Sequence, residues 1–147
     1  MSESKIELSK QLCFPVYVTS RLIIREYQPH LEALGLTYPQ YLVLMVLWQE
    51  DGLGVNEIAQ KLFLNTNTIT PLLKRMEKQA LLVRKRSSVD ERKVQIVLTP
   101  TGKEMEQKAL HIPEKLIGKL RDSDVNMNEL RQLKQQLEGL IDLLAKG

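Results

Sequence analysis

The 147-residue sequence has few of the residues that build covalent or metal cross-links. Its single cysteine, Cys13, excludes a disulfide within one chain and a zinc site made of several thiolates. The two histidines, His30 and His111, lie far apart in the sequence without a carboxylate-rich ligand pattern between them. We therefore expect no metal site and no cofactor, and a plain surface or core role for each histidine.

Long apolar runs are also missing. No run approaches the roughly 20 residues that span a bilayer, and the first ten residues lack the basic-then-apolar order of a signal peptide. These absences favour a cytoplasmic protein without membrane contact. Phe occurs twice and Trp once, so the 43% of apolar residues must build a core mainly from Leu, Ile, Val and Met. The length favours a single domain.

Helical patterns fill most of the chain. The first long helix is expected over about residues 13–34, with Gly35 as its stop. Thr37 and Gln40 form a capping-box pattern before an apolar helix, and residues 51–54 form a turn. Apolar residues spaced i, i+3, i+4, i+7 then predict two short helices joined by a turn over residues 63–65. The residues of this spacing are Val55, Ile58, Ala59 and Leu62, followed by Ile69, Leu72, Leu73 and Met76.

The second of these short helices has a polar face suited to DNA. Short hydroxyl and amide side chains come first and cations follow, which fits base edges and phosphates. The candidate DNA-binding residues here are Asn65, Thr66, Asn67, Thr68, Thr70, Lys74 and Arg75. An ordinary capped surface helix is the alternative. Pro71 removes one backbone donor and should bend the helix, unless the helix starts near Thr68.

Residues 83–98 read VRKRSSVDERKVQIVL, which predicts two short strands around a polar turn. Eight basic and three acidic residues fall within 74–93, so this window carries +5 although the whole chain carries only +3. A basic hairpin directly after two short helices is typical of a winged helix, in which a helix enters the major groove and the hairpin tip an adjacent minor groove. The candidate contacts are Arg84, Lys85, Arg86, Asp90 and Arg92. A solvated charged face is the alternative.

The C-terminal part predicts two further helices. Thr101 and Glu104 suggest a capping box for a helix that continues toward Arg121 and is kinked by Pro113. A last helix follows Asn126. Its leucines alternate by three and four, namely Leu130, Leu133, Leu137, Leu140 and Leu144. This seam favours a dimer interface over packing on the chain's own core.

The expected fold is therefore mainly α with a small β-hairpin wing. It is one domain over 1–147, with a winged helix-turn-helix DNA-binding lobe over 36–100 and dimerisation helices over 5–35 and 101–147.

The residues around Cys13 favour a reactive thiolate over an inert cysteine that only packs. Pro15 is most comfortable in the first turn of a helix, which places Cys13 at the helix N-terminus, where partial positive charge stabilises a thiolate. Tyr17 lies one turn further on, and Tyr27 and Tyr38 fall in the same region. Phenolic hydroxyls can donate to a thiolate. The alternatives are an inert cysteine and tyrosines that only pack.

An ordered set of motifs resembles the MarR family of winged-helix repressors, and most of all its one-cysteine organic-hydroperoxide sensors, OhrR. The set is QLCF, Tyr17, Tyr27, TYPQYLVL, NTNTITPLLKRMEKQ and RKRSSVDERKVQIVLT, from about Leu12 to Thr101. The resemblance implies a dimer in which Cys13 is the sensing thiolate, Tyr27 and Tyr38 of the partner hydrogen-bond its sulfur, and Tyr17 lies close by. It also implies that the helix after Asn65 enters the major groove and that Arg92, braced by Asp90, enters the minor groove. Pro15 and Asn67 depart from the usual pattern.

The expected function is a homodimeric repressor, not an enzyme, that binds double-stranded operator DNA and releases it when an organic hydroperoxide oxidises Cys13. With no second cysteine, the sulfenic acid must react onward outside its own chain, for example with a low-molecular-weight thiol. Two alternatives keep the fold: release by a small aromatic ligand, and a response to general oxidative stress. Two others change the class: a thiol peroxidase and a helical dimerisation module without DNA contact.

Overall fold

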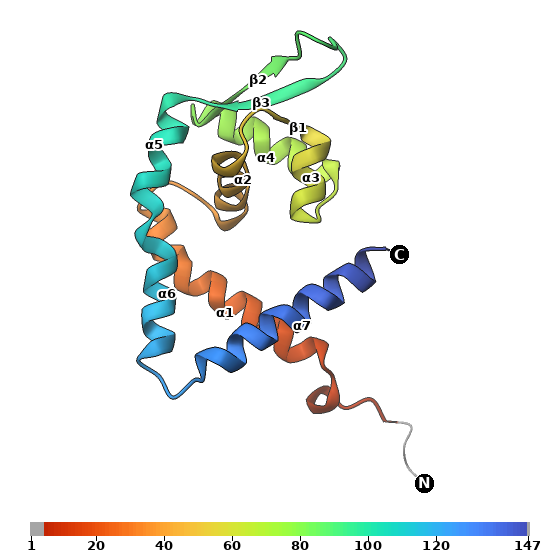
Figure 1. The fold of residues 1–147 in the computed structure, drawn as a ribbon, viewed down its shortest axis with the longest axis vertical. Helices are drawn as coiled ribbons and strands as arrows, with labels where there is room; N and C mark the ends of the chain where they lie inside the picture. The colour runs from red at the N-terminus through yellow and green to blue at the C-terminus, as the bar shows by residue number, and fades with distance from the viewer. Residues whose placement is uncertain (1–4, 147) are drawn as a thin grey trace.

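The computed structural model describes residues 5–146 and consists of helices with one small sheet (Figure 1). The elements are η1 (Leu8–Lys10), α1 (Cys13–Glu32), α2 (Tyr38–Gln49), β1 (Leu53–Gly54), α3 (Val55–Leu62), α4 (Thr66–Lys78), β2 (Leu82–Arg86), β3 (Val94–Leu98), α5 (Pro100–Ala109), α6 (His111–Arg121) and α7 (Met127–Ala145). The expected helical fold with a hairpin wing is confirmed. None of the described helices is both long and apolar enough to cross a membrane.

A compact lobe forms from α2 to β3, and its hairpin extends beyond the helices (Figure 1). The sheet is antiparallel with order β1-β3-β2, and Leu82 pairs with Leu98 at the base of the hairpin while Arg86 pairs with Val94 nearer its tip. Beneath the sheet, α3 and α4 pack on each other, and α4 also packs against β2. The core of the lobe is aliphatic and includes the fully buried Leu44, Ile58, Ile69, Leu73, Met76, Leu82 and Ile96.

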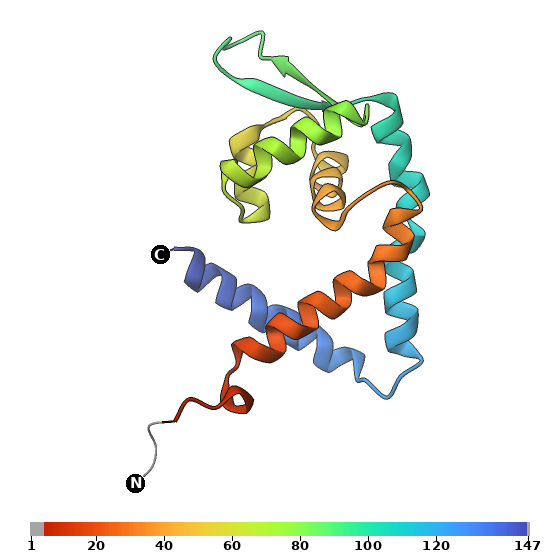
Figure 2. The same cartoon turned by 180° about the vertical axis from the view of Figure 1, so that it is seen from behind.

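Helices α5 and α6 run from the lobe to the other end of the molecule, where α6 packs against α1 (Figure 2). Lys119 Nζ lies 2.8 Å from a Glu26 carboxylate oxygen across this contact. The hydrogen bond and charge of Lys119 lower the pKa of Glu26. The two histidines also meet here, because the ring centroids of His30 and His111 are 6.0 Å apart at nearly a right angle.

Most helix boundaries follow the sequence signals. Gly35 ends the first helix region with φ of 72°, and Thr37 and Gln40 form the expected capping box on α2. The side chain of Asn126 caps α7 by accepting from the backbone N–H groups of Asn128 and Glu129.

Three sequence expectations need correction. Residues 53–54 were expected within a turn, but they form strand β1, which pairs Leu53 with Ile96 of β3. Thr99, not Thr101, caps α5, because its side chain accepts from Gly102 N at 3.0 Å and Pro100 takes the first helical position. The expected kinked helix is two helices that meet at Leu110, since Pro113 has no N–H to donate to Ala109.

Helix α7 stands apart from this packing. None of its residues over 127–145, all of which are described, is buried. Leu133, Leu140, Leu143 and Leu144 are exposed, as are Phe14, Val16, Leu22 and Ile24 of α1. The two helices therefore present apolar surface that the described chain leaves uncovered.

Candidate functional site

Cys13 is the first residue of α1 and is exposed. Backbone N–H groups at this end of the helix have no partner within the helix and point toward its N-terminus. Pro15 lies in the first turn of α1, where its missing N–H costs no helical hydrogen bond, and the helix continues unbroken to Glu32. The departure from the family pattern at Pro15 therefore does not disturb the helix around Cys13.

Tyr17 lies one helical turn after Cys13 and is also exposed. The guanidinium of Arg21 lies 4.9 Å from the centre of the Tyr17 ring, a cation–π distance. The exposed surface beside Cys13 therefore includes a phenol and a cation.

Tyr27 is too far along the same helix to contact Cys13. Fourteen residues separate the two positions on α1, which corresponds to about 21 Å at the rise of an α-helix. A hydrogen bond between them can therefore form only between two chains. The expectation that Tyr27 hydrogen-bonds the sulfur therefore requires a second copy of the chain.

Tyr27 and Tyr38 lie together between α1 and α2. Their rings stack with centroids 5.8 Å apart and planes 12° apart. The buried Tyr41 contacts both, with ring centroids 6.3 Å from each. Burial raises the pKa of all three phenols above 10.0; Tyr38 adds to the shift at Tyr27, and both Tyr27 and Tyr38 add to the shift at Tyr41. At neutral pH the three hydroxyls are protonated and can donate a hydrogen bond.

The candidate DNA-binding face of α4 is exposed at Thr66, Asn67, Lys74 and Arg75, whereas Ile69, Leu72, Leu73 and Met76 point into the core. Asn65 caps the helix, since its side-chain oxygen accepts from Thr68 N at 3.0 Å. The helix starts at Thr66, not near Thr68, so Pro71 lies inside it. Thr70 is partly buried.

The basic side chains of the wing differ in whether other residues of the chain bind them. Arg84 Nε lies 3.2 Å from Oε1 of Glu77 on α4, and Arg84 N donates to the same carboxylate. Arg86 donates to the backbone oxygen of Glu91 across the hairpin. Within residues 5–146, Lys85 and Arg92 form no ion pair.

Asp90 organises the tip of the wing. Its carboxylate accepts from Arg92 N at 3.0 Å, and its own N–H contacts the hydroxyl of Ser87. Asp90 thus supports the backbone of Arg92, while the described residues leave the Arg92 guanidinium without an acidic partner.

Comparisons with known proteins agree with this architecture. The family model described as transcriptional regulator SarA/Rot matches residues 25–109. The organic hydroperoxide resistance transcriptional regulator of Bacillus subtilis is 43% identical over 139 residues, which cover 95% of this chain and 92% of that protein. The chain belongs to the MarR family of winged-helix transcriptional regulators.

Two solved structures of AbfR, a protein of Staphylococcus epidermidis, resemble this MarR-family chain. Reduced AbfR bound to DNA has a TM-score of 0.76 and 34% identity, over 94% of each chain. Disulfide-formed AbfR has a TM-score of 0.63 and 37% identity, over 91% of this chain and 92% of that one. The conformation of this chain is therefore more similar to reduced, DNA-bound AbfR than to disulfide-formed AbfR.

Sequence reasoning missed two residues of this MarR-family site. Tyr41 completes the tyrosine cluster, and its position three residues after Tyr38 in a predicted helix was a usable signal. Glu77, which neutralises Arg84, lies seven residues before it across a helix end and a turn, so only the folded structure brings the two together.

Proposed function

We propose that this MarR-family chain is a dimeric repressor that binds operator DNA and releases it when an organic hydroperoxide oxidises Cys13. The observation that carries the proposal is the placement of an exposed Cys13 at the N-terminus of α1, about 21 Å along the helix from Tyr27. The Bacillus relative is named for organic hydroperoxide resistance, and reduced AbfR has been solved on DNA, which supports the same role here.

In this proposal the Cys13 thiolate attacks the terminal oxygen of the hydroperoxide. The O–O bond breaks, the sulfur becomes a sulfenic acid, and the alkoxide takes a proton and leaves as an alcohol. A low-molecular-weight thiol can then form a mixed disulfide with Cys13 and release water. Tyr27 and Tyr38 of the partner subunit would stabilise the thiolate before the reaction, with Tyr17 nearby.

Oxidation would change DNA binding through the two lobes. In the reduced dimer, α4 of each lobe would lie in a major groove, with Thr66, Asn67 and Arg75 toward the DNA, while Lys85 and Arg92 of each wing reach the minor groove. The remaining candidate contacts are Asn65, Thr68, Thr70, Lys74, Arg84, Arg86 and Asp90.

Loss of the sulfur–phenol hydrogen bonds would rotate the lobes out of register with successive grooves. A fall in occupancy from 99% to 1% requires about 5.5 kcal/mol of bias. In this role the chain is a cytoplasmic regulator without catalytic turnover.

A gel shift tests the proposal with a duplex from the promoter region of its own gene. We expect wild type to leave the duplex on treatment with cumene hydroperoxide and cysteine. Cys13→Ser, which changes only the sulfur atom, should remain bound. Release of the serine variant under the same treatment would show that Cys13 is not the sensor.

A second candidate signal rests on a cavity of about 250 Å³ between α1 and α2. Its lining is largely apolar and includes Ile24, Leu31, Leu36, Tyr38 and Pro39. The apolar residues suit the ring of a small aromatic effector, the class of the first alternative, while Glu32 is the one charged residue of the lining. Salicylate that displaces the duplex equally from wild type and Cys13→Ser would support this second route, and salicylate without effect on either would exclude it.

A further inference from the structure

We infer that Trp48 is a positioning residue that couples the tyrosine cluster to the base of the wing. The inference rests on the proposed function, in which the state of Cys13 is read by the phenols of the partner subunit. It concerns how a change at those phenols reaches the DNA-binding surface of the same lobe.

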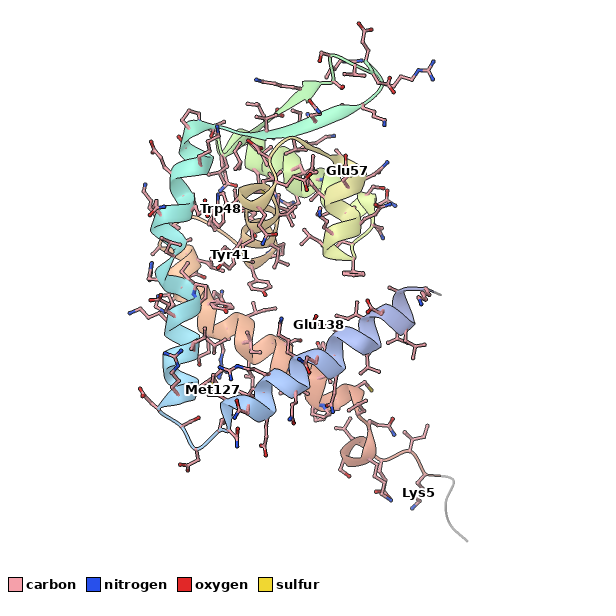
Figure 3. The ribbon with its side chains drawn as sticks, in the orientation of Figure 1. Lys5, Tyr41, Trp48, Glu57, Met127 and Glu138 are labelled. Atoms are coloured by element: carbon pink, nitrogen blue, oxygen red, sulfur yellow. The ribbon has the colours of Figure 1, made fainter. Side chains whose placement is uncertain are left out.

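The first link is a continuous aromatic contact along α2. Tyr41 contacts Tyr27 and Tyr38 on one side, and its ring centroid lies 6.2 Å from that of Trp48 in an edge arrangement. Tyr41 and Trp48 are seven residues apart and thus lie on the same face of the helix, two turns from each other (Figure 3). Tyr41 is 4% exposed, so its ring has no free space into which it can move independently.

The second link is a hydrogen bond from α2 to α5. Trp48 Nε1 donates to the backbone oxygen of Gly102 at 3.0 Å, although 54 positions separate the two residues in the chain. The indole N–H is the single donor of this side chain. Its loss would leave the apolar contacts of the ring in place and remove only the directional link.

The third link is the tight contact between α5 and the start of the hairpin. A Cβ atom at Gly102 would lie 2.0 Å from the backbone oxygen of Leu81, the residue before β2. Thr99, which follows β3, donates from its backbone to Leu81 and from its hydroxyl to Ala80, and it accepts from Gly102 N. Both ends of the hairpin are therefore held at the turn of α5 that Trp48 contacts.

Together these contacts form an unbroken path of packed groups. A displacement of Tyr27 or Tyr38 moves the Tyr41 ring, α2 carries the movement as a rigid helix, and Trp48 transmits it to Gly102 and the hairpin base. The path places the wing under control of the tyrosine cluster within one lobe, in addition to any rotation of whole lobes in the dimer.

The test is the ratio of DNA affinities in the reduced and oxidised states. Trp48→Phe keeps an aromatic ring but loses both the N–H and part of the packed volume of the indole. We expect its reduced form to bind the promoter duplex nearly as wild type does, and Cys13 to react with cumene hydroperoxide at the wild-type rate. The affinity ratio should shrink by about fivefold or more, the lower end of typical coupling between two sites. Tyr41→Phe, which keeps the ring contacts, is the matched control and should retain the wild-type ratio.

The outcomes separate the inference from the function on which it rests. A wild-type ratio in Trp48→Phe overturns the coupling role of Trp48 and leaves the sensor intact. A wild-type chain that keeps its DNA affinity after oxidation overturns the proposed function itself.

If Trp48→Phe does not fold, the wild-type chain gives the answer, because Trp48 is its only tryptophan. We expect its fluorescence, measured without DNA, to change on oxidation of wild type and to stay constant in Cys13→Ser. Unchanged emission in oxidised wild type overturns the inference.

Discussion

The phenols of Tyr27, Tyr38 and Tyr41 show how burial prepares single residues for the proposed chemistry. Burial raises the pKa of each because an apolar environment disfavours the phenolate. A protonated phenol can donate to a thiolate, whereas a phenolate would repel it. Packing of the three rings thus keeps the hydroxyls of Tyr27 and Tyr38 in the donor form that a thiolate from the partner would require.

The raised pKa values predict a loss of stability in alkali. Where the unfolded chain loses a phenolic proton above pH 10.0, the folded chain retains it. The stabilisation is complete below that pH and is lost as pH rises toward the pKa of the folded state. Tyr41→Phe removes one such group. Urea unfolding at about pH 8 and about pH 10.5 should show a smaller loss of stability for Tyr41→Phe than for wild type. Equal losses would contradict the assignment.

Sequence reasoning singled out Cys13 and three tyrosines because each left a local signal. Pro15 indicated a helix N-terminus at Cys13, and the structure places the residue there. The contact of Tyr41 with Trp48 follows from their helical spacing, but the bond from Trp48 to Gly102 joins residues 54 positions apart. No local sequence pattern indicates a contact between residues so far apart, so the hydrogen bond from Trp48 to Gly102 could be identified only from the folded structure.

At the scale of elements, the hairpin is a basic segment whose cations differ in availability. Glu77 holds the side chain of Arg84 against α4, and Arg86 closes the hairpin through Glu91. Lys85 and Arg92 form no ion pair within residues 5–146. The sequence does not distinguish the five basic residues of the hairpin from one another. In the structure, Arg84 and Arg86 stabilise the wing through bonds to Glu77 and to the backbone of Glu91.

This difference predicts unequal effects on DNA binding. Arg92→Ala should weaken operator affinity and lower the salt slope by about 2 per dimer, since each lost phosphate contact contributes about 0.9. Arg84→Ala removes the same charge from the same hairpin, but that charge is already paired with Glu77. Its salt slope should change by less than about half as much. Fluorescence anisotropy over a series of salt concentrations measures both. Equal slopes for the two variants would show that the ion pair opens on DNA.

The elements themselves were largely predictable, and the exceptions have a common cause. The capped apolar helix α2 and the regularly spaced helices α3 and α4 agree with expectation. Strand β1 has only two residues, and it exists because Asp51 accepts from Leu98 N and β3 lies alongside. Thr99 caps α5 because the end of β3 places it there, although Thr101 fits the local motif equally well. Tertiary contacts decided both cases.

The whole molecule has an apolar surface that one chain does not cover. Apolar residues of both helices are exposed, namely Leu133, Leu140, Leu143 and Leu144 of α7 and Phe14, Val16, Leu22 and Ile24 of α1, and no residue of α7 is fully buried. Covering both helices with a second copy removes this surface from water, which stabilises association by about 25 cal/mol for each Å² of apolar area buried. The seam that the sequence predicted is therefore where the dimer of the proposed function would form.

Leu140→Glu tests this interface because it places a charge in the middle of the seam. We expect a monomer by light scattering at concentrations where wild type is a dimer, since an unpaired carboxylate is costly to bury. Affinity for the promoter duplex should fall by about 100-fold or more, because the two half-sites are no longer bound by one linked pair of lobes. Gln135→Glu adds the same charge outside the leucine seam of α7 and should remain a dimer. A dimeric Leu140→Glu would move the interface elsewhere.

The same variant separates the two roles of the dimer, because DNA binding and peroxide sensing both depend on it in the proposed mechanism. In a monomer, Cys13 is about 21 Å along α1 from Tyr27 and has no partner phenol within reach. Hydrogen bonds to charged groups contribute about 1.5–3 kcal/mol each, so oxidation of Cys13 in Leu140→Glu should be about tenfold slower or more. Stopped-flow consumption of cumene hydroperoxide measures this rate, with Gln135→Glu as the control. A monomer that reacts as fast as the dimer would show that Cys13 obtains its reactivity from its own helix terminus, without the phenols of a partner.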